Sequence, residues 1–258
     1  MHSLTELFHR IGAYGRPRDV SVNGWRGDQL FGWITVVLVV VFLIVLVQLV
    51  LVALRSRDEA PPSASRGDDA RSRFIVAFTT LLLVLAVDVV ALWHGKRDLN
   101  EALLRVPADS EHPILVEVMA QQWAWSFRLA GEDGKFGTDD DIVTLHTLRL
   151  PVGRPARLEL RSKDVIHSLY LPHFRMKRDA QPGATTELLL EPTEVGTFEI
   201  ACAQHCGANH YLMRATLDVV EPPTFQRYVG DESTLAKERA AARPSDSQWA
   251  WAFGEAQR

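Results

Sequence analysis

Residues 30–54 read LFGWITVVLVVVFLIVLVQLVLVAL, 25 positions without a charged side chain. Residues 74–93 form a second apolar run, FIVAFTTLLLVLAVDVVALW, which has Asp88 as the one charge among its 20 positions. A helix needs about 20 apolar residues to cross the hydrocarbon core of a bilayer. Buried helices of soluble proteins are rarely so uniformly aliphatic twice in succession, and no small-residue cleavage site of a signal peptide follows the first run. The two runs therefore predict a membrane-spanning helical hairpin.

Arginine is concentrated between the two runs. Residues 55–73 carry 5 Arg, whereas residues 1–29 carry 4. Positive charge near the ends of spans marks the cytoplasmic side, so we expect this loop inside and both ends of the chain outside. Asp88 is a functional candidate because carboxylates are rare within spans. It lies close enough to the outer end of its run to reach the interface, and we favour that reading.

The overall composition excludes several classes of protein. Of the 258 residues, 47% are hydrophobic and 23% charged, with a formal net charge of −4. Such a chain is not a disordered polymer, because it has enough apolar side chains to form a core. Its weak acidity argues against nucleic acid as the main partner, since a phosphate-binding domain is normally basic. Two cysteines are too few for a disulfide scaffold.

The part of the chain after the second run is predicted to be mostly β-structure. Short segments rich in β-forming residues recur, with Gly and Pro between them, at residues 114–129, 142–150, 156–162, 168–171, 185–190, 197–201 and 214–220. This spacing is typical of an antiparallel sandwich or barrel. After residues 222–223 (PP) the composition shifts to Ala, Glu, Arg and Gln, which predicts a helix at residues 225–242 and then a loose end.

One short segment carries the candidate chemistry. Residues 202–213 read CAQHCGANHYLM, and a further imidazole, His167, stands 35 residues before Cys202. Thiolate, imidazole and thioether groups together suit copper that alternates between Cu(I) and Cu(II). A mononuclear blue-copper site uses one cysteine. Two thiolates with two histidines and a methionine offer enough ligands for two coppers that share bridging sulfurs, and a backbone carbonyl of the loop can complete the set.

Two other interpretations of this segment stay open. Cys202 and Cys206 would form a disulfide in an oxidising compartment, but a disulfide leaves His210 and Met213 at their spacing without a role. A zinc site is the second alternative, and methionine is a poor zinc ligand. We favour copper over both, and we regard His205 as a bystander.

These motifs resemble subunit II of the haem-copper cytochrome c oxidases. The shared segments are the C-x3-C-G-x2-H-x2-M pattern and residues 122–125 (QWAW), 150–155 (LPVGRP), 164–168 (DVIHS) and 179–183 (DAQPG). The order of two spans, a β domain and a cysteine loop near its end also matches, so that the resemblance covers residues 30–220. It implies a two-helix transmembrane hairpin plus an all-β cupredoxin-like Greek-key barrel that holds a dinuclear CuA centre.

The resemblance implies six metal ligands, namely His167, Cys202, Gln204, Cys206, His210 and Met213. The two cysteines would bridge the two copper ions, and the two histidines would each cap one. The methionine would be an axial ligand of one copper. The backbone carbonyl of Gln204 would ligate the other.

Trp123 matches the tryptophan through which cytochrome c delivers its electron to members of this family. Strand alternation would place Trp123 and Trp125 on one face of a strand, so the alternative that both are ordinary sheet aromatics stays open. Residues 95–258 hold 24 acidic and 19 basic side chains. The acids Glu132, Asp133 and Asp139–Asp141 would suit the steering of a basic cytochrome c, or they form a solvated loop.

The implied organisation has four parts. Residues 1–29 are an N-terminal outer segment, 30–94 the transmembrane hairpin with spans at about 30–54 and 74–93, 95–222 the cupredoxin-like CuA domain, and 223–258 a partly helical C-terminal tail. The implied function is to accept electrons from cytochrome c and to pass them to haem in subunit I, where oxygen is reduced to water. The expected location is the bacterial inner membrane, with the copper domain on the periplasmic side. The expected partners are subunit I with its haem and CuB, other oxidase subunits, cytochrome c and membrane lipid, without nucleic acid.

Two positions depart from the family pattern. Gln204 replaces the usual Glu whose side chain helps to hold magnesium against subunit I, and a neutral amide is a weaker ligand for that ion than a carboxylate. Magnesium at the subunit I interface is therefore in doubt. Ile75 stands where the family often has a Glu that opens a proton path, and it cannot carry a proton. An alternative of another class is a membrane-anchored copper carrier or assembly protein.

Overall fold

The computed structural model describes residues 2–55, 70–98 and 113–242. Most of the expected arginine-rich loop, at residues 56–69, and the expected loose end after residue 242 lie outside the described residues. The chain divides into two compact units, of which the first contains residues 1–16 and 25–102 and the second contains residues 17–24 and 103–258. The short segment 17–24 thus belongs to the same unit as the β-rich part of the chain.

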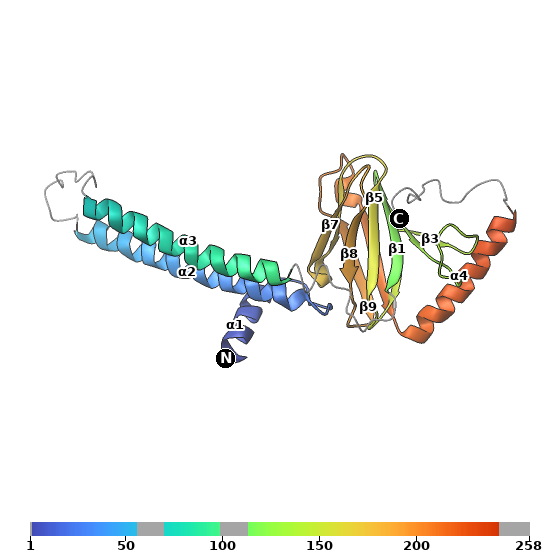
Figure 1. Ribbon diagram of the computed structural model, residues 1–258, viewed down its shortest axis with the longest axis horizontal. Helices are drawn as coiled ribbons and strands as arrows, with labels where there is room; N and C mark the ends of the chain where they lie inside the picture. The colour runs from blue at the N-terminus through green and yellow to red at the C-terminus, as the bar shows by residue number, and fades with distance from the viewer. Residues whose placement is uncertain (1, 56–69, 99–112, 243–258) are drawn as a thin grey trace. The chain divides into compact units, whose positions relative to one another are not determined.

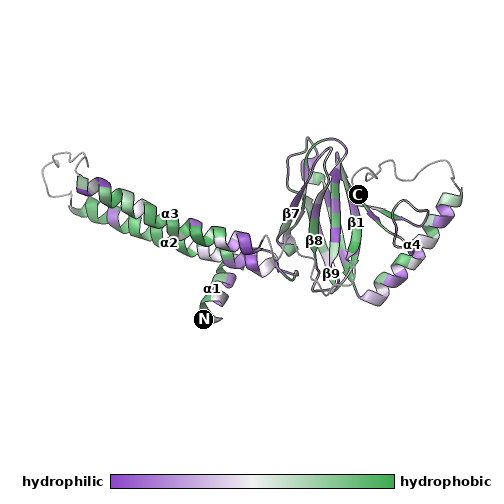
Figure 2. Cartoon of the chain, viewed as in Figure 1, coloured by the Kyte–Doolittle hydropathy of each residue, from purple (hydrophilic) through white to green (hydrophobic). Residues whose placement is uncertain are grey.

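The first unit is helical (Figure 1). It is built from α1 (His2–Ala13), α2 (Gly24–Arg55) and α3 (Ala70–Asp98). α2 and α3 are long and apolar enough to cross a membrane, and their most apolar stretches are not buried inside the protein. Figure 2 shows apolar residues around these helices. The predicted pair of apolar helices is confirmed, and each helix continues for several residues beyond its apolar run.

Two glycines bring α1 and α2 into backbone contact. A Cβ atom at Gly12 would lie 1.6 Å from the carbonyl oxygen of Asp28, and one at Gly32 would lie 1.8 Å from the carbonyl oxygen of Phe8. The fully buried Asp28 also forms an ion pair with Arg16 at 2.8 Å. α1 was not predicted from the sequence, because it has no apolar run long enough to be noticed beside the spans.

The second unit contains two five-stranded sheets. The first has the strand order β3-β2-β1-β5-β8, with β1 Ile114–Gln121, β2 Ala124–Leu129, β3 Ile142–Leu145, β5 Ala156–Ser162 and β8 Thr186–Leu190. The second has the order β4-β10-β9-β6-β7, with β4 Thr147–Pro151, β6 His167–Leu171, β7 Met176–Ala180, β9 Gly196–Cys202 and β10 Arg214–Val220. The predicted all-β domain is confirmed, and β5 and β10 have the bounds that the sequence predicts.

The predicted antiparallel arrangement does not hold at two pairings. β1 pairs with β5, and β10 with β4, in parallel. Between β3 and β5 the chain leaves the first sheet, forms β4 in the second sheet and returns, so β5 runs in the same direction as β1. Alternating hydrophobicity specifies the buried face of a strand, but it does not specify the neighbouring strand.

Residues 142–150 and β7 differ from the predicted strands. The predicted strand at residues 142–150 is divided at His146, which has a φ of 58° where the chain passes from one sheet to the other. β7 was not predicted, because its sequence MKRDA has three charged residues at its centre. β7 is the last strand of its sheet, and edge strands tolerate charged side chains that also discourage pairing with other chains.

The core between the sheets includes one residue from the N-terminal part of the chain, before α2. Val20 is fully buried in this core. Its backbone N–H donates to the carbonyl of His173 at 2.9 Å, and its carbonyl accepts from Thr193 N at 2.9 Å. Residues 17–24 therefore complete the β domain although they precede α2 in the sequence.

The helix predicted at residues 225–242 is confirmed as α4 (Pro222–Ala242). It begins earlier than predicted because proline is well suited to the first turn of a helix, where its missing N–H is not needed. Phe225 of α4 belongs to the core of the β domain. The helix is thus anchored to the domain at its N-terminal end.

Candidate metal centre

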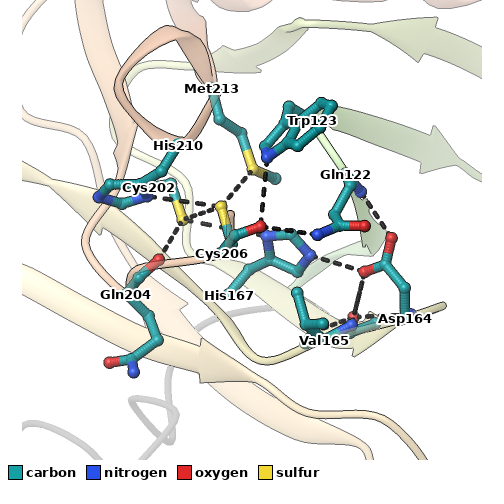
Figure 3. A network of polar contacts seen from close by, with 11 residues as sticks. Gln122, Trp123, Asp164, Val165, His167, Cys202, Gln204, Cys206, His210 and Met213 are labelled. Carbon is teal, nitrogen blue, oxygen red and sulfur yellow. Dashed lines mark hydrogen bonds and ion pairs between the residues drawn. The ribbon is translucent and has the colours of Figure 1, made fainter. Parts of the chain in front are cut away.

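β6, β9 and the loop after β9 bring the predicted ligands together (Figure 3). His167 is the first residue of β6, and Cys202 is the last residue of β9. β6 and β9 are antiparallel neighbours, with Leu169 opposite Cys202. The loop after β9 carries Cys206, passes through a short 3-10 helix (His210–Leu212) and returns to β10 at Met213.

Backbone hydrogen bonds close this loop. Cys202 N donates to the carbonyl of Met213 at 3.1 Å, and Ala203 N donates to the carbonyl of Ser168 at 2.9 Å. These bonds hold the two ends of the loop together. The closed loop in turn fixes the spacing of the four predicted ligand side chains that it carries.

The two cysteine sulfurs lie at the middle of the donor atoms, 3.8 Å apart. Cys202 Sγ lies 4.0 Å from His167 Nδ1 and 3.2 Å from the carbonyl oxygen of Gln204. Cys206 Sγ lies 3.4 Å from His210 Nδ1 and 3.8 Å from Met213 Sδ. Each sulfur thus has its own imidazole, and the donor atoms of His167, Cys202 and Cys206 all lie within 4.8 Å of one another.

Neither cysteine forms a disulfide. Their 3.8 Å separation is well above the length of a disulfide bond, which is about 2.05 Å. The sulfurs are nevertheless close enough for both to contact one metal ion. The arrangement supports a metal centre over the disulfide alternative, and the sulfur and nitrogen donors are of the kind that copper binds.

The two thiols differ in acidity. Burial acts to raise the pKa of Cys202, but hydrogen bonds from the His167 ring and the Ser168 backbone outweigh burial and lower this pKa to about 6. Burial, together with the negative charge of Cys202, raises the pKa of Cys206 to about 12. Burial acts to lower the pKa of His167, but Cys202 and Asp164 raise it overall. Without metal, the site therefore holds one thiolate and one thiol at neutral pH.

Trp123 lies in the turn between β1 and β2, whereas Trp125 lies in β2 and is fully buried. The expectation that both share one strand face is therefore wrong, because residues 114–129 form a hairpin instead of one strand. The indole Nε1 of Trp123 donates to the carbonyl of Cys206 at 3.2 Å. The ring of Trp125 instead meets His167 edge-on, with 6.1 Å between the centroids.

Two residues next to the predicted ligands have roles that the sequence did not reveal. Gln122 Nε2 donates to the same Cys206 carbonyl at 2.9 Å. Asp164 Oδ1 lies 2.9 Å from His167 Nε2, and Asp164 Oδ2 accepts from Gln122 N at 2.7 Å. Both residues stand in segments shared with the oxidase family, but sequence spacing alone does not show that they meet.

Gly207 leaves room for the turn. Its φ is +115°, and a Cβ atom there would lie 2.9 Å from Gln122 Nε2 and 3.3 Å from Trp123 Cζ2. An L-residue at this position is strained by its backbone angle and also collides with the turn. The glycine thus lets the cysteine loop approach the Gln122–Trp123 turn closely.

The acidic loop before β3 is only partly open to solvent. Asp140 is buried and lies 3.7 Å from Lys237 of α4, and Asp141 pairs with Arg128 at 3.3 Å. Glu132, Asp133 and Asp139 are exposed. Of the acids expected to steer a partner, these three have the exposure that such a role requires.

Known proteins resemble this chain, and the family match lies over the β domain. Residues 114–220 match the family model for the periplasmic domain of cytochrome c oxidase subunit II. The alternative cytochrome c oxidase subunit 2 of Bradyrhizobium diazoefficiens is 36% identical over 169 residues, which are 57% of this chain and 57% of that protein. Cytochrome c oxidase subunit 2 of Thermostichus vulcanus is 36% identical over 123 residues, 48% of this chain and 35% of that protein.

A solved structure is also similar. The periplasmic domain of subunit II of the Bradyrhizobium japonicum cytochrome oxidase aligns over 52% of this chain and 99% of that domain, with 23% identity and a TM-score of 0.43. The chain spans 57% of the length of the first relative and 35% of the second. The family match at residues 114–220 coincides with strands β1 to β10.

Proposed function

This chain is a divergent member of the cytochrome c oxidase subunit II family, and on that premise we propose that it is the electron-accepting subunit of a haem-copper cytochrome c oxidase. It takes electrons from cytochrome c at a dinuclear copper centre and passes them to haem in subunit I. Reduction of oxygen and any translocase activity belong to the assembled complex, in which subunit I carries the haem and CuB.

The observation that supports this proposal is the pairing of donors around two sulfurs. Cys202 and Cys206 lie 3.8 Å apart, and each faces a different imidazole. In the proposed centre the two thiolates and the imidazoles of His167 and His210 would hold the two coppers. Met213 and the carbonyl of Gln204 complete the set. When bound, the copper pair supplies a one-electron redox couple.

The protein surrounds this donor set with apolar groups and hydrogen bonds. Cys206 and Met213 are buried, which limits access of water to one side of the site. A carrier that hands copper over needs a low-coordinate site from which the ion can leave. The buried sulfur pair and the closed loop favour a retained redox centre over such a carrier.

Trp123 is the proposed point at which the electron enters. Its ring packs against the domain core and is half-buried, so one part contacts the cysteine loop while another part is available to a partner. Its hydrogen bond to the carbonyl of Cys206 links the indole directly to a proposed copper ligand.

The proposed location follows from the two apolar helices and the family of the β domain. The chain is anchored in the bacterial inner membrane by α2 and α3, with the copper domain on the periplasmic side, in contact with lipid and with other oxidase subunits. The arginines at residues 55–73 then lie on the cytoplasmic side, in agreement with the charge rule for short loops.

The test uses the full chain in detergent, loaded with copper and then freed of excess metal. We expect two coppers per chain and an electron paramagnetic resonance spectrum in which one unpaired electron interacts with two copper nuclei. Cys202→Ser, which removes one sulfur, is expected to lose this spectrum. One copper per chain, or splitting from a single copper nucleus in the unmodified protein, contradicts the dinuclear assignment.

A further inference from the structure

One carboxylate joins two separate parts of the site (Figure 3). Asp164 lies between β5 and β6, three residues before His167. Its Oδ1 lies 2.9 Å from Nε2 of His167, the ring nitrogen that points away from Cys202. Its Oδ2 accepts a hydrogen bond from the backbone N–H of Gln122 at 2.7 Å, from the turn that carries Trp123.

The same turn is bonded to the cysteine loop from its other side. Gln122 Nε2 and Trp123 Nε1 donate to one acceptor, the carbonyl oxygen of Cys206, at 2.9 and 3.2 Å. The contacts therefore run without interruption from the imidazole of His167 through Asp164 and the turn to Cys206. The first and last residues of this series of contacts are His167 and Cys206, whose donor atoms lie within 4.8 Å of each other.

We propose that Asp164 is a positioning residue for electron transfer, which fixes the position of the His167 ring relative to the turn that carries Trp123. This inference rests on the proposed function. The carboxylate orients the imidazole so that Nδ1 faces Cys202, and it fixes the backbone from which the indole reaches the cysteine loop. Partners of metal-bound histidines have this orienting effect generally.

The local chemistry requires a carboxylate at this position. The groups that donate to the Asp164 carboxylate include N–H groups and a hydroxyl, since Val165 N also donates to Oδ1 at 2.7 Å and Ser162 Oγ donates to it at 3.4 Å. A carboxylate offers only acceptors, whereas an asparagine offers one acceptor oxygen and one NH2 donor. Asp164→Asn therefore places a donor opposite either the His167 ring or the Gln122 N–H, while the size of the side chain stays the same.

The experiment compares Asp164→Asn with Asp179→Asn in the full chain. Asp179 is a matched control because it accepts a hydrogen bond from Ser168, next to His167, whereas within the described part of the chain no hydrogen bond joins its side chain to the ring or the turn. The first measurement uses metal-free protein with 15N-labelled Trp, Gln and His. Asp164→Asn is expected to shift the Trp123 indole and Gln122 amide signals and the His167 ring nitrogens, and Asp179→Asn is expected to leave them in place.

The second measurement uses copper-loaded protein. Asp164→Asn is expected to alter the copper hyperfine pattern and to slow the maximal rate of electron transfer from cytochrome c by about 10-fold, the scale on which such partners act. Combined with Trp123→Phe, its effect on the rate is expected to be less than multiplicative, because both changes act through the same turn. If Asp164→Asn does not fold, Asp164→Glu replaces it, since the longer carboxylate displaces the turn while it keeps two acceptors.

The outcomes separate the possibilities. Unchanged indole, amide and ring signals in Asp164→Asn overturn the proposal. A higher KM for cytochrome c that depends on ionic strength, with an unchanged maximal rate and copper spectrum, also overturns it, because it shows that Asp164 only attracts the donor protein. Failure of the unmodified chain to form the copper centre refutes the proposed function instead, and the metal-free measurements still decide the contact role of Asp164.

Discussion

Trp123 donates its indole N–H to the backbone carbonyl of Cys206 across 3.2 Å. A tryptophan on a hairpin turn is thereby bonded to the residue whose sulfur lies between His210 and Met213. The contact distinguishes Trp123 from Trp125, which is two positions along the chain and lies wholly within the core.

Trp123→Phe is expected to slow electron uptake from cytochrome c and to leave the copper content unchanged. Phenylalanine keeps most of the ring volume but removes the N–H that reaches Cys206. Stopped-flow oxidation of reduced cytochrome c at low ionic strength measures the effect, since electrostatic attraction keeps the encounter fast there.

Trp125→Phe is the matched control for this variant. The buried Nε1 of Trp125 has no hydrogen-bond partner among the described residues, so the change loses ring volume but no hydrogen bond, and we expect the cavity that it leaves to lower the free energy of unfolding. Equal rates for both variants and the unmodified protein would make Trp123 an ordinary packing residue. A slow rate for Trp125→Phe alone would mean that the electron enters through Trp125 and not through Trp123.

Iodoacetamide is expected to modify Cys202 of the metal-free protein well before Cys206. The pKa of about 6 makes Cys202 mostly thiolate at pH 7, and the pKa of about 12 keeps Cys206 protonated there. The thiolate is the reactive form, so the labelling rate at Cys202 should fall as the pH drops below about 6. Peptide mapping by mass spectrometry identifies the modified residue. Faster labelling of Cys206 contradicts this assignment of charge.

Gly207→Ala is expected to weaken copper retention and to destabilise the domain by roughly 1–3 kcal/mol, because the new residue is strained at this backbone angle. Its Cβ also lies 2.9 Å from Gln122 Nε2. Gly134→Ala is the control, since Gly134 has a φ of +68° but a Cβ atom there would have no neighbour within 4 Å. Copper titration and chemical unfolding compare the two variants. Equal copper binding would show that the close approach to the turn is unimportant.

Val20→Ala is expected to destabilise the β domain by about 1.5 kcal/mol, since two buried methyl groups are lost. Val22→Ala, at a position that is 43% exposed in the same segment, is expected to have little effect. Urea unfolding of the full chain, followed by tryptophan fluorescence, measures both. An equal loss of unfolding free energy in both variants would mean that the burial of Val20 does not stabilise the domain.

Much of the architecture could be predicted because local patterns determine it. The apolar runs that became α2 and α3 need no long-range information. β5 and β10 alternate cleanly between buried and half-buried positions, so their bounds could be recognised. The predicted metal ligands could be identified from the sequence because four of the five side chains lie within one loop of 12 positions, 202–213.

The remaining features depend on contacts between distant segments. The turn at Gln122–Trp123 contains no glycine, proline or asparagine, so the hairpin between β1 and β2 had no turn signal. The contact of Asp164 with Gln122 spans 42 residues. Val20 resembled any other residue before a span, since its burial depends on His173 and Thr193.

The place of residues 17–24 in the β domain constrains how the chain is threaded through a membrane. These residues precede both α2 and α3, whereas the strands that receive them follow both. Residues 17–24 and the strands belong to one folded domain, so the chain must cross the membrane an even number of times between them. This conclusion does not depend on the number of arginines. If α2 and α3 cross a membrane, residues 17–24 can pack against His173 and Thr193 only after those two residues have reached the same side. In that case β1 to β8, which precede Thr193, must also cross before the domain can be completed.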